Sequence, residues 1–229
     1  MILKKTTIIV AGGSGTRMNA EIPKQFIELC SKPILMHTIE AFHSYDPAMS
    51  IILVIPATQH DFWNKLCLKH QFSIKHELAY GGENRFQSVL NGLNLVEDTG
   101  LIAIHDGVRP LVSQNTIQKC FDTAMQLGNA IPTTECIESI RELTSDNNSA
   151  VDRSKYRLIQ TPQVFESKLL KNAYTQDYSS FFTDDASVVE SYFATNDPNK
   201  KIHLVEGNRE NIKITTPYDL IIAEAIFKK

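Results

Sequence analysis

The sequence has no cysteine or histidine spacing that indicates a zinc site. Its four cysteines, Cys30, Cys67, Cys120 and Cys136, include no CxxC pair, and none of the seven histidines belongs to an HExxH motif. Zinc sites in proteins normally show spacings of this kind. We therefore expect free, buried or half-buried thiols and no metal site built by the protein alone.

The chain also lacks an excess of positive charge. Its formal net charge at pH 7 is -3, from 23 lysine and arginine residues against 26 aspartate and glutamate residues. Proteins that bind nucleic acid through bulk electrostatics normally show a basic excess or a basic run. We therefore expect no nucleic-acid partner, and any anionic ligand must be bound by a local cluster of cations.

Long hydrophobic runs are missing as well. The apolar run near the N-terminus is short and ends in glycines, so it fits neither a secretion signal nor a transmembrane span. We therefore expect a cytoplasmic protein without a membrane segment. With 229 residues, 42% of them hydrophobic, the chain is long enough to bury an ordinary core. No long linker divides it, so we expect one domain over residues 1–229.

The most informative segment is the first predicted strand and the loop after it. The apolar run 6–10 leads into residues 11–18, AGGSGTRM, and then into residues 23–25, PKQ. Glycines let backbone N–H groups turn toward an anion, and Arg17 and Lys24 add two positive charges. The segment therefore predicts a loop that binds a polyphosphate.

Two familiar phosphate-binding loops do not match this segment. A Walker A loop needs GxxxxGK[ST], but Gly15 is followed by Thr16 and Arg17. The dinucleotide-binding GxGxxG pattern would have its third glycine at Met18, and the acidic residue expected about twenty residues further on is not at the end of an obvious second strand. A plain structural turn remains the alternative, although a turn requires neither Arg17 nor Lys24.

The rest of the chain alternates predicted strands and helices. Apolar runs predict strands or extended segments at 50–56, 73–79, 101–104, 129–132 and 202–205. Helical spacing of apolar residues predicts helices at 34–43, 59–70, 86–96, 113–127 and 166–174, and from 183 and 217 onward. This order indicates an α/β fold with a Rossmann-like, mostly parallel sheet flanked by helices. Ligands of such sheets lie beyond the carboxyl ends of the strands, where the following loops converge.

The alternation is interrupted between residues 133 and 156. Ile137, Ile140 and Leu143 are followed by the polar stretch 145–149 and then by residues 150–153. This pattern predicts two short strands around a polar turn. We therefore expect a β-hairpin arm that protrudes from the sheet.

Several motifs, taken together and in order, resemble one family. Residues 11–18 with 23–25 resemble the signature of sugar-phosphate nucleotidyltransferases. The later motifs are GGENR at 81–85 with Ser88, HDGVRP at 105–110, VDR at 151–153, QTPQ at 160–163, TDDAS at 183–187 and NIKITTP at 211–217. The set spans nearly the whole chain and resembles the 2-C-methyl-D-erythritol 4-phosphate cytidylyltransferase family of non-mevalonate isoprenoid synthesis. Ribitol-5-phosphate cytidylyltransferases share most of it, but the VDR and TDDAS segments favour the methylerythritol family.

The chemistry implied by this resemblance fits the residues. A phosphate oxygen would attack the α-phosphorus of CTP in line while pyrophosphate leaves, so two polyanions must come together. The attacking phosphate has a second pKa of about 6 and needs no general base. Arg17 and Lys24 are therefore candidate catalytic residues, and the resemblance adds Lys213; each would otherwise be interpreted as a solvated surface cation. Mg²⁺ is the expected cofactor, held mainly by the substrate phosphates.

The resemblance also implies two sets of binding residues. The set for CTP is Ala11, Gly12, Gly13, Gly15, Gly82, Ser88 and Asp106. The set for the sugar-alcohol phosphate is Asp106, Arg109, Arg153, Thr161 and Thr183. Without the resemblance, Asp106 and Arg109 would be interpreted as an ion pair within a loop, and His105 as a buried, hydrogen-bonded histidine.

The resemblance further implies a homodimer in which the arm, at about residues 133–156, helps to complete the site of a second subunit. In the family the arm usually carries Asp-Thr followed closely by a basic residue, whereas this chain has ECIE at 135–138. The missing hydroxyl leaves one substrate contact open. The altered arm leaves a non-catalytic nucleotide-binding subunit as one alternative, and the motifs shared with ribitol-5-phosphate cytidylyltransferases leave ribitol 5-phosphate as an alternative acceptor.

Overall fold

The structure, a computed structural model, describes residues 3–13, 22–97 and 99–228. The strands of its main sheet are β1 (Lys5–Val10), β4 (Ser50–Ile55), β5 (Glu77–Tyr80), β6 (Leu101–Asp106), β7 (Asn129–Glu135), β10 (Arg157–Ile159), β11 (Gln163–Glu166) and β12 (Leu204–Glu206). The α-helices are α1 (Ile34–Tyr45), α2 (His60–Lys69), α3 (Arg85–Leu93), α4 (Gln114–Leu127), α5 (Ser167–Ala173), α6 (Asp185–Asn196) and α7 (Pro217–Phe227). Over these ranges, no helix is long and apolar enough to cross a membrane.

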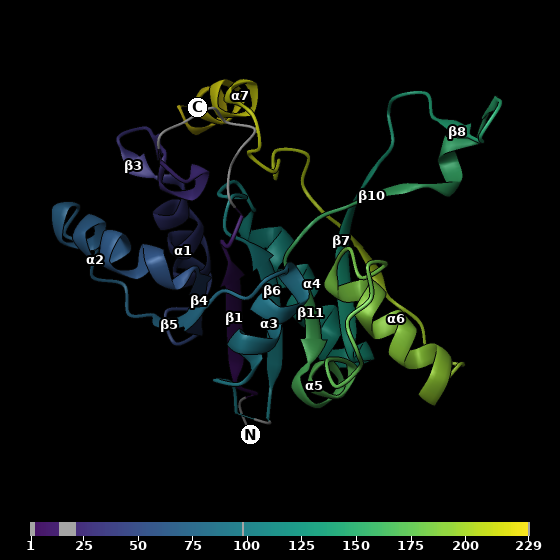
Figure 1. The fold of residues 1–229 in the computed structure, drawn as a ribbon, viewed down its shortest axis with the longest axis horizontal. Coiled ribbons are helices and arrows are strands. Elements are labelled where there is room, and N and C mark those ends of the chain that lie inside the picture. The colour runs from purple at the N-terminus through teal and green to yellow at the C-terminus, as the bar shows by residue number, and fades with distance from the viewer. Residues whose placement is uncertain (1–2, 14–21, 98, 229) are drawn as a thin grey trace.

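The main sheet is mixed but mostly parallel in its central part (Figure 1). Its strand order is β10-β7-β11-β6-β1-β4-β5, and β12 pairs with β7 outside this path. Strand β1 lies parallel to both β4 and β6, and β4 lies parallel to β5. Strand β11 runs antiparallel between β6 and β7. The predicted α/β fold with a mostly parallel sheet is therefore confirmed.

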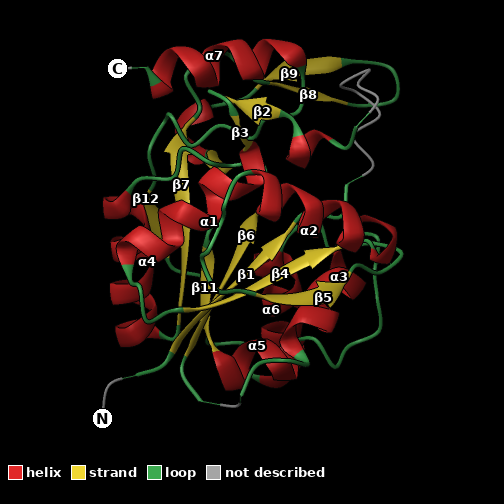
Figure 2. Ribbon diagram, turned by 90° about the vertical axis from the view of Figure 1, so that its left-hand side faces the viewer, coloured by secondary structure: helices red, strands yellow, loops and turns green. Residues whose placement is uncertain are grey.

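Helices cover both faces of this sheet, which explains the nearly continuous apolar runs of its central strands. In β1, Ile9 packs on one face with Leu35 of α1 and Phe121 of α4. Its neighbour Ile8 points to the other face and packs with Val89 of α3. Figure 2 shows α1 and α4 on one side of the strands and α5 and α6 on the other.

A smaller core lies beyond the carboxyl ends of the central strands. It contains Val108, from the turn after β6, together with Ile214 and Ala223 of the C-terminal segment. The Ile214 N–H also donates to the Val108 carbonyl at 2.9 Å. Helix α7 lies above this end of the sheet (Figure 1). The C-terminal segment is thereby attached next to the loops expected to carry the chemistry.

Most predicted elements are confirmed to within a few residues, including the helices predicted to begin at about 113, 183 and 217. The Ser113 side chain caps α4, Asp184 caps α6, and α7 begins at Pro217. The strand expected at 73–79 is shorter and later, because only Glu77–Tyr80 pairs with β4. Strand β6 continues to Asp106, so this residue ends a strand rather than lying in the loop after it.

Strand β11 was not predicted, because Pro162 interrupts a short apolar run. Strands β10 and β11 both pair antiparallel with β7, and the residues between them form a bulge relative to β7. Ile159 pairs with Thr133, whereas Val164 pairs with Ala130, so five steps along one strand match three along the other. The extra residues at 160–162 lie beside the end of β6, because the next residue, Gln163, already pairs with that strand.

The interruption predicted between residues 133 and 156 contains a β-hairpin. Strands β8 (Arg141–Leu143) and β9 (Asn148–Ala150) pair antiparallel, and their side chains are exposed. Figure 1 shows this pair apart from the main sheet. A second small pair, β2 (Glu28–Leu29) with β3 (Lys32–Pro33), precedes α1.

Candidate active site

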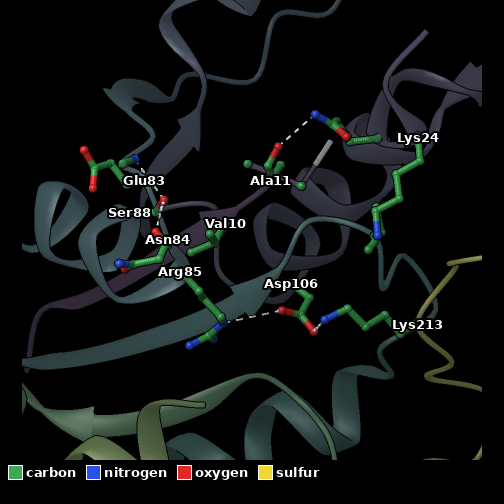
Figure 3. Close-up of a pocket in the computed structure, with 14 residues that line it drawn as sticks. Val10, Ala11, Lys24, Glu83, Asn84, Arg85, Ser88, Asp106 and Lys213 are labelled. Atoms are coloured by element: carbon green, nitrogen blue, oxygen red, sulfur yellow. Dashed lines mark hydrogen bonds and ion pairs between the residues drawn. The ribbon is translucent and has the colours of Figure 1, made fainter. Parts of the chain in front are cut away.

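A cavity of about 450 Å³ opens beyond the carboxyl ends of β1 and β6 (Figure 3). In the sheet register Val10 pairs with both Val54 and Asp106, so three parallel strands end at the same level. The lining residues are Val10, Ala11, Gly12, Gly13, Lys24, Gln25, Gly82, Glu83, Asn84, Arg85, Ser88, Asp106, Val108 and Lys213. Three post-strand loops and the segment before α7 therefore meet here.

Many of the predicted site residues lie in or next to this cavity. Those that line it are Ala11, Gly12, Gly13, Lys24, Gly82, Ser88, Asp106 and Lys213. Arg109 and Thr161 do not line it but contact Asp106 from behind. Gly15 and Arg17 lie outside the described residues, so their places in the site stay predictions.

Two predicted residues lie elsewhere in this chain. Arg153 begins a short 3-10 helix (Arg153–Lys155) near the hairpin, and its guanidinium donates to the Ile137 carbonyl. Thr183 lies just before the cap of α6 and lines a separate cavity with Tyr156 and Arg157. The fold of one chain thus leaves Arg153 and Thr183 away from the main cavity.

Asp106 is the centre of the charges at the cavity. Its Oδ2 lies 3.0 Å from the Nζ of Lys213 and 3.1 Å from the Nε of Arg109, and its Oδ1 lies 4.0 Å from the Nε of Arg85. Burial alone would raise the pKa of Asp106, but these three cations together hold it well below its usual range. Asp106 is therefore a carboxylate surrounded by positive charge.

The position of Lys213 depends on two nearby residues of the same segment, Asn211 and Ile214. Asn211 is fully buried, and its Nδ2 donates to the Thr161 carbonyl at 2.8 Å. On the other side the Ile214 N–H donates to Val108. The Lys213 side chain itself is half-exposed, so it can reach both Asp106 and the open cavity.

Arg85 is a cavity residue whose role sequence reasoning did not assign. Its two terminal nitrogens donate to the two carboxylate oxygens of Asp185 at 3.0 and 2.6 Å. The hydroxyl of Tyr174 donates to the same carboxylate at 2.6 Å. Burial disfavours the charge of Arg85, but Asp185 and Asp106 together raise its pKa above the usual value. An arginine and an aspartate in two separate motifs were the only sequence signal for this pair.

The turn after β6 packs directly on the glycine-rich loop. A Cβ atom on Gly107 would lie 2.8 Å from the Cβ of Ala11 and 3.0 Å from the Cδ1 of Leu35. Such contacts are too short for any larger residue. Gly107 therefore lets the Asp106 turn and the loop at Ala11 share one wall of the cavity.

The opposite wall carries polar groups at the start of α3. The Gly82 N–H donates to Ser88 Oγ at 3.0 Å, and Ser88 Oγ donates to the Asn84 carbonyl at 2.8 Å. The Asn84 side chain caps the helix by accepting from the Gln87 N–H. These contacts fix donors and acceptors at one end of the cavity, away from Lys24 and Lys213 (Figure 3).

Comparisons with known proteins agree with this fold and identify the family. Residues 6–229 match the family model for 2-C-methyl-D-erythritol 4-phosphate cytidylyltransferase. The protein of that name from Bacteroides thetaiotaomicron is 52% identical over 224 residues, which cover 98% of this chain and 100% of the relative. The one from Bacteroides fragilis is 54% identical over 222 residues, which cover 97% and 99%.

A solved structure shows the same likeness. The crystal structure of 4-diphosphocytidyl-2C-methyl-D-erythritol synthase from Anaerococcus prevotii matches with a TM-score of 0.82 and 27% identity. The match covers 99% of this chain and 97% of that one. The resemblance found in the motifs is thus confirmed along almost the whole length, and the chain belongs to the 2-C-methyl-D-erythritol 4-phosphate cytidylyltransferase family.

Proposed function

We propose that this protein transfers the cytidylyl group of CTP to 2-C-methyl-D-erythritol 4-phosphate and releases pyrophosphate. The observation that carries the proposal is the cation cluster at Asp106, next to a glycine-rich loop in a cavity large enough for a nucleotide. Family membership supplies the identities of the two substrates. Both are polyanions, and a site that joins them needs positive charge fixed at their meeting point.

On the nucleotide side, the backbone of Gly12 and Gly13 binds the triphosphate, and Lys24 neutralises it. Arg17 joins Lys24 in stabilising the charge that develops in the transition state. Gly82 and Ser88 bind the polar edge of cytosine, since discrimination between bases needs donors and acceptors held in place. Ser88 lines the cavity, and its hydroxyl, which accepts from Gly82 and donates to Asn84, keeps one lone pair that can accept from the base.

On the acceptor side, Asp106 accepts hydrogen bonds from the sugar-alcohol hydroxyls, and Arg109 and Lys213 bind near the phosphate. The phosphate oxygen attacks without a general base, because a phosphomonoester with a second pKa of about 6 is already ionised at neutral pH. Catalysis then consists of positioning and charge stabilisation. Arg153 completes this side of the site from a second subunit, whereas Thr183 lines a separate cavity of this chain and its contact with the acceptor stays a prediction.

Magnesium is the cofactor of this proposal, held mainly by the substrate phosphates. Mg²⁺ in phosphoryl-transfer sites is held by one or two carboxylates together with substrate phosphates. Glu83 lines the cavity and would supply such a ligand, whereas Asp106 is already paired with Lys213 and Arg109. Among the residues that the structure describes, no group of three or more histidine, cysteine or acidic side chains could hold a metal. When bound, the ion would neutralise charge on the phosphates.

The proposal includes a homodimer formed through the arm at residues 133–156. Large apolar side chains are exposed on the arm and on the strand that follows it, namely Ile137, Leu143, Tyr156, Leu158 and Ile159. Exposed apolar side chains on one segment are typical of protein interfaces. The enzyme would consist of one nucleotidyltransferase domain over residues 1–229 and act in the cytoplasm.

The test is a pyrophosphate-release assay with CTP, Mg²⁺ and methylerythritol phosphate. We expect turnover with this acceptor and much less with ribitol 5-phosphate. Preference for ribitol 5-phosphate would support the alternative acceptor. Binding of CTP without turnover on either acceptor, beside a working family member, would support the non-catalytic alternative. Lys24→Ala should abolish turnover, whereas Lys119→Ala, which removes a surface ion pair with Glu206, should not.

A further inference from the structure

A buried histidine that the proposed chemistry does not use lies behind the Asp106–Arg109 ion pair. His105 is fully buried, and its ring packs edge-on against Phe42 with the ring centroids 4.9 Å apart. Its Nε2 lies 3.1 Å from the Arg109 carbonyl oxygen, and its Nδ1 lies 2.9 Å from the Oγ1 of Thr161. Both ring nitrogens therefore have hydrogen-bond partners.

These partners determine the tautomer of the ring. A carbonyl oxygen can only accept, so Nε2 carries the proton and donates it to Arg109. Nδ1 is then an acceptor, and the Thr161 hydroxyl donates to it. Desolvation lowers the pKa of His105 to about 4. The Arg109 carbonyl and the Asp106 charge oppose this shift, whereas the charges of Arg109 and Lys213 add to it. The ring is therefore neutral at physiological pH.

Thr161 extends the hydrogen bonds to the main chain of the site. Its Oγ1 accepts from the Asp106 N–H at 3.1 Å. A single chain of hydrogen bonds thus runs from the Asp106 N–H through Thr161 and His105 to the Arg109 carbonyl. It joins the main-chain groups of the two residues whose side chains form the ion pair at 3.1 Å. The Arg109 Nη1 is held in addition by the Asn211 carbonyl at 2.8 Å.

We infer that His105 is a positioning residue that fixes the Asp106–Arg109 turn for the acceptor, and that Thr161 acts through His105 rather than by touching the substrate. The inference rests on the proposed function, because it assumes that Asp106 and Arg109 bind the acceptor. Thr161 is 5% exposed and, unlike Ser88, does not line the cavity, and its hydroxyl already donates to His105 and accepts from Asp106. Thr161 therefore positions the residues that bind the substrate and does not contact the substrate itself.

The first test compares three threonine variants. Thr161→Val keeps the shape but leaves the Asp106 N–H unpaired, so kcat/KM for the acceptor should fall about tenfold or more. The loss should lie mainly in the KM for the acceptor, with little change in the KM for CTP. Thr161→Ser should restore activity because it keeps the hydroxyl. Thr7→Val, at a buried threonine in the middle of β1, serves as the control. A loss in Thr161→Ser equal to that in Thr161→Val would overturn the inference.

A double-mutant cycle separates positioning from direct substrate contact. If Thr161 acts through His105, the losses caused by Thr161→Val and His105→Gln should be strongly non-additive. Additive losses would show that Thr161 contacts the substrate independently of His105 and would contradict the inference.

A spectroscopic measurement requires no turnover and no folded His105 variant. In protein labelled with ¹⁵N-histidine, the His105 signal, assigned through its contact with the Phe42 ring, should be that of a neutral ring protonated at Nε2. It should not titrate between about pH 6 and 8, and Thr161→Val should shift its Nδ1 resonance. A ring protonated at Nδ1, or a Nδ1 signal unmoved in Thr161→Val, would overturn the inference. Because this readout does not depend on activity, it tests the hydrogen bonds of His105 and Thr161 separately from the proposed function.

Discussion

The Nζ of Lys213 lies 3.0 Å from the carboxylate of Asp106, although one residue precedes the last helix and the other ends a central strand. The same carboxylate oxygen also contacts Arg109. Asp106 therefore holds both cations in place, Lys213 lining the cavity and Arg109 next to it. A phosphate that enters can take over these cations without their side chains having to be ordered first, which is the condition for strong electrostatic catalysis.

Lys213 is expected to be essential for turnover but not for folding. Lys213→Ala should lower kcat by about a hundredfold to a thousandfold, since the loss of one preorganised charge contact has this effect in comparable sites. The protein should still fold, because Lys213 is half-exposed and Asp106 keeps Arg109 as a partner, although the free energy of unfolding should fall by the contribution of the Lys213–Asp106 pair. Steady-state kinetics and urea unfolding test both parts, with Lys119→Ala as the control. Near-normal turnover in Lys213→Ala would remove this lysine from the catalytic residues.

Asp106 should make stability depend on pH in the acid range. An unfolded aspartate has a pKa of about 3.9, and the folded pKa is lower because of Lys213, Arg85 and Arg109. The unfolded state then binds more protons, so this contribution to stability is full above about pH 4 and is lost as pH falls through the folded pKa.

The variant Asp106→Asn lacks this contribution. Its free energy of unfolding, measured in denaturant between about pH 2 and 5, should fall less steeply on acidification than that of the wild type. The exposed Asp197→Asn serves as the control and should follow the wild type. Parallel curves for the wild type and Asp106→Asn would contradict the low pKa.

The buried carboxylate of Asp185 should be important for stability. Asp185→Asn removes the charge that compensates Arg85, and the loss of one partner of a buried pair costs about 3 to 5 kcal/mol. Asp197→Asn removes an exposed partner of Lys200, whose Nζ is 3.6 Å away, and should cost less than about 1 kcal/mol. Urea unfolding of both variants compares the two sites. Equal losses would mean that the Arg85–Asp185 pair is not important to the fold.

The arm should determine the oligomeric state. Leu143 in the hairpin is 79% exposed and Leu68 on α2 is 80% exposed, so the two leucines are matched in solvent exposure. Leu143→Glu should weaken the proposed dimer because it introduces a charge into an apolar interface. Leu68→Glu should leave the dimer intact. Light scattering over a concentration series measures the mass of each, and a monomeric wild type would contradict the dimer itself.

The central strands and the cavity loops could be predicted from local patterns in the sequence. The runs at β1, β4 and β6 are apolar because both sheet faces are covered, and this signal does not depend on distant residues. The same holds for the caps Ser113 and Asp184, which act on their own helices. These features position the glycine-rich loop and the Asp106 turn.

Other features depend on residues far apart in the chain. The Arg85–Asp185 pair joins helices whose sequence positions differ by 100 residues, and no local pattern indicates it. Strand β11 has only four residues beside a proline, too short for a periodic signal. The Thr161 hydroxyl makes hydrogen bonds to both His105 and Asp106 because it is buried between them. The sequence does not reveal this burial. Local patterns therefore predicted the cavity but not the contacts that hold it.

The reaction itself is tested most directly by ³¹P NMR of the protein with CTP, Mg²⁺ and methylerythritol phosphate. We expect the three CTP signals and the phosphomonoester signal to decline together. A pair of coupled diphosphate-diester signals and free pyrophosphate should rise in equal amounts. Formation of CDP and inorganic phosphate, or an unchanged spectrum under conditions in which a family member reacts, would contradict cytidylyl transfer by this protein.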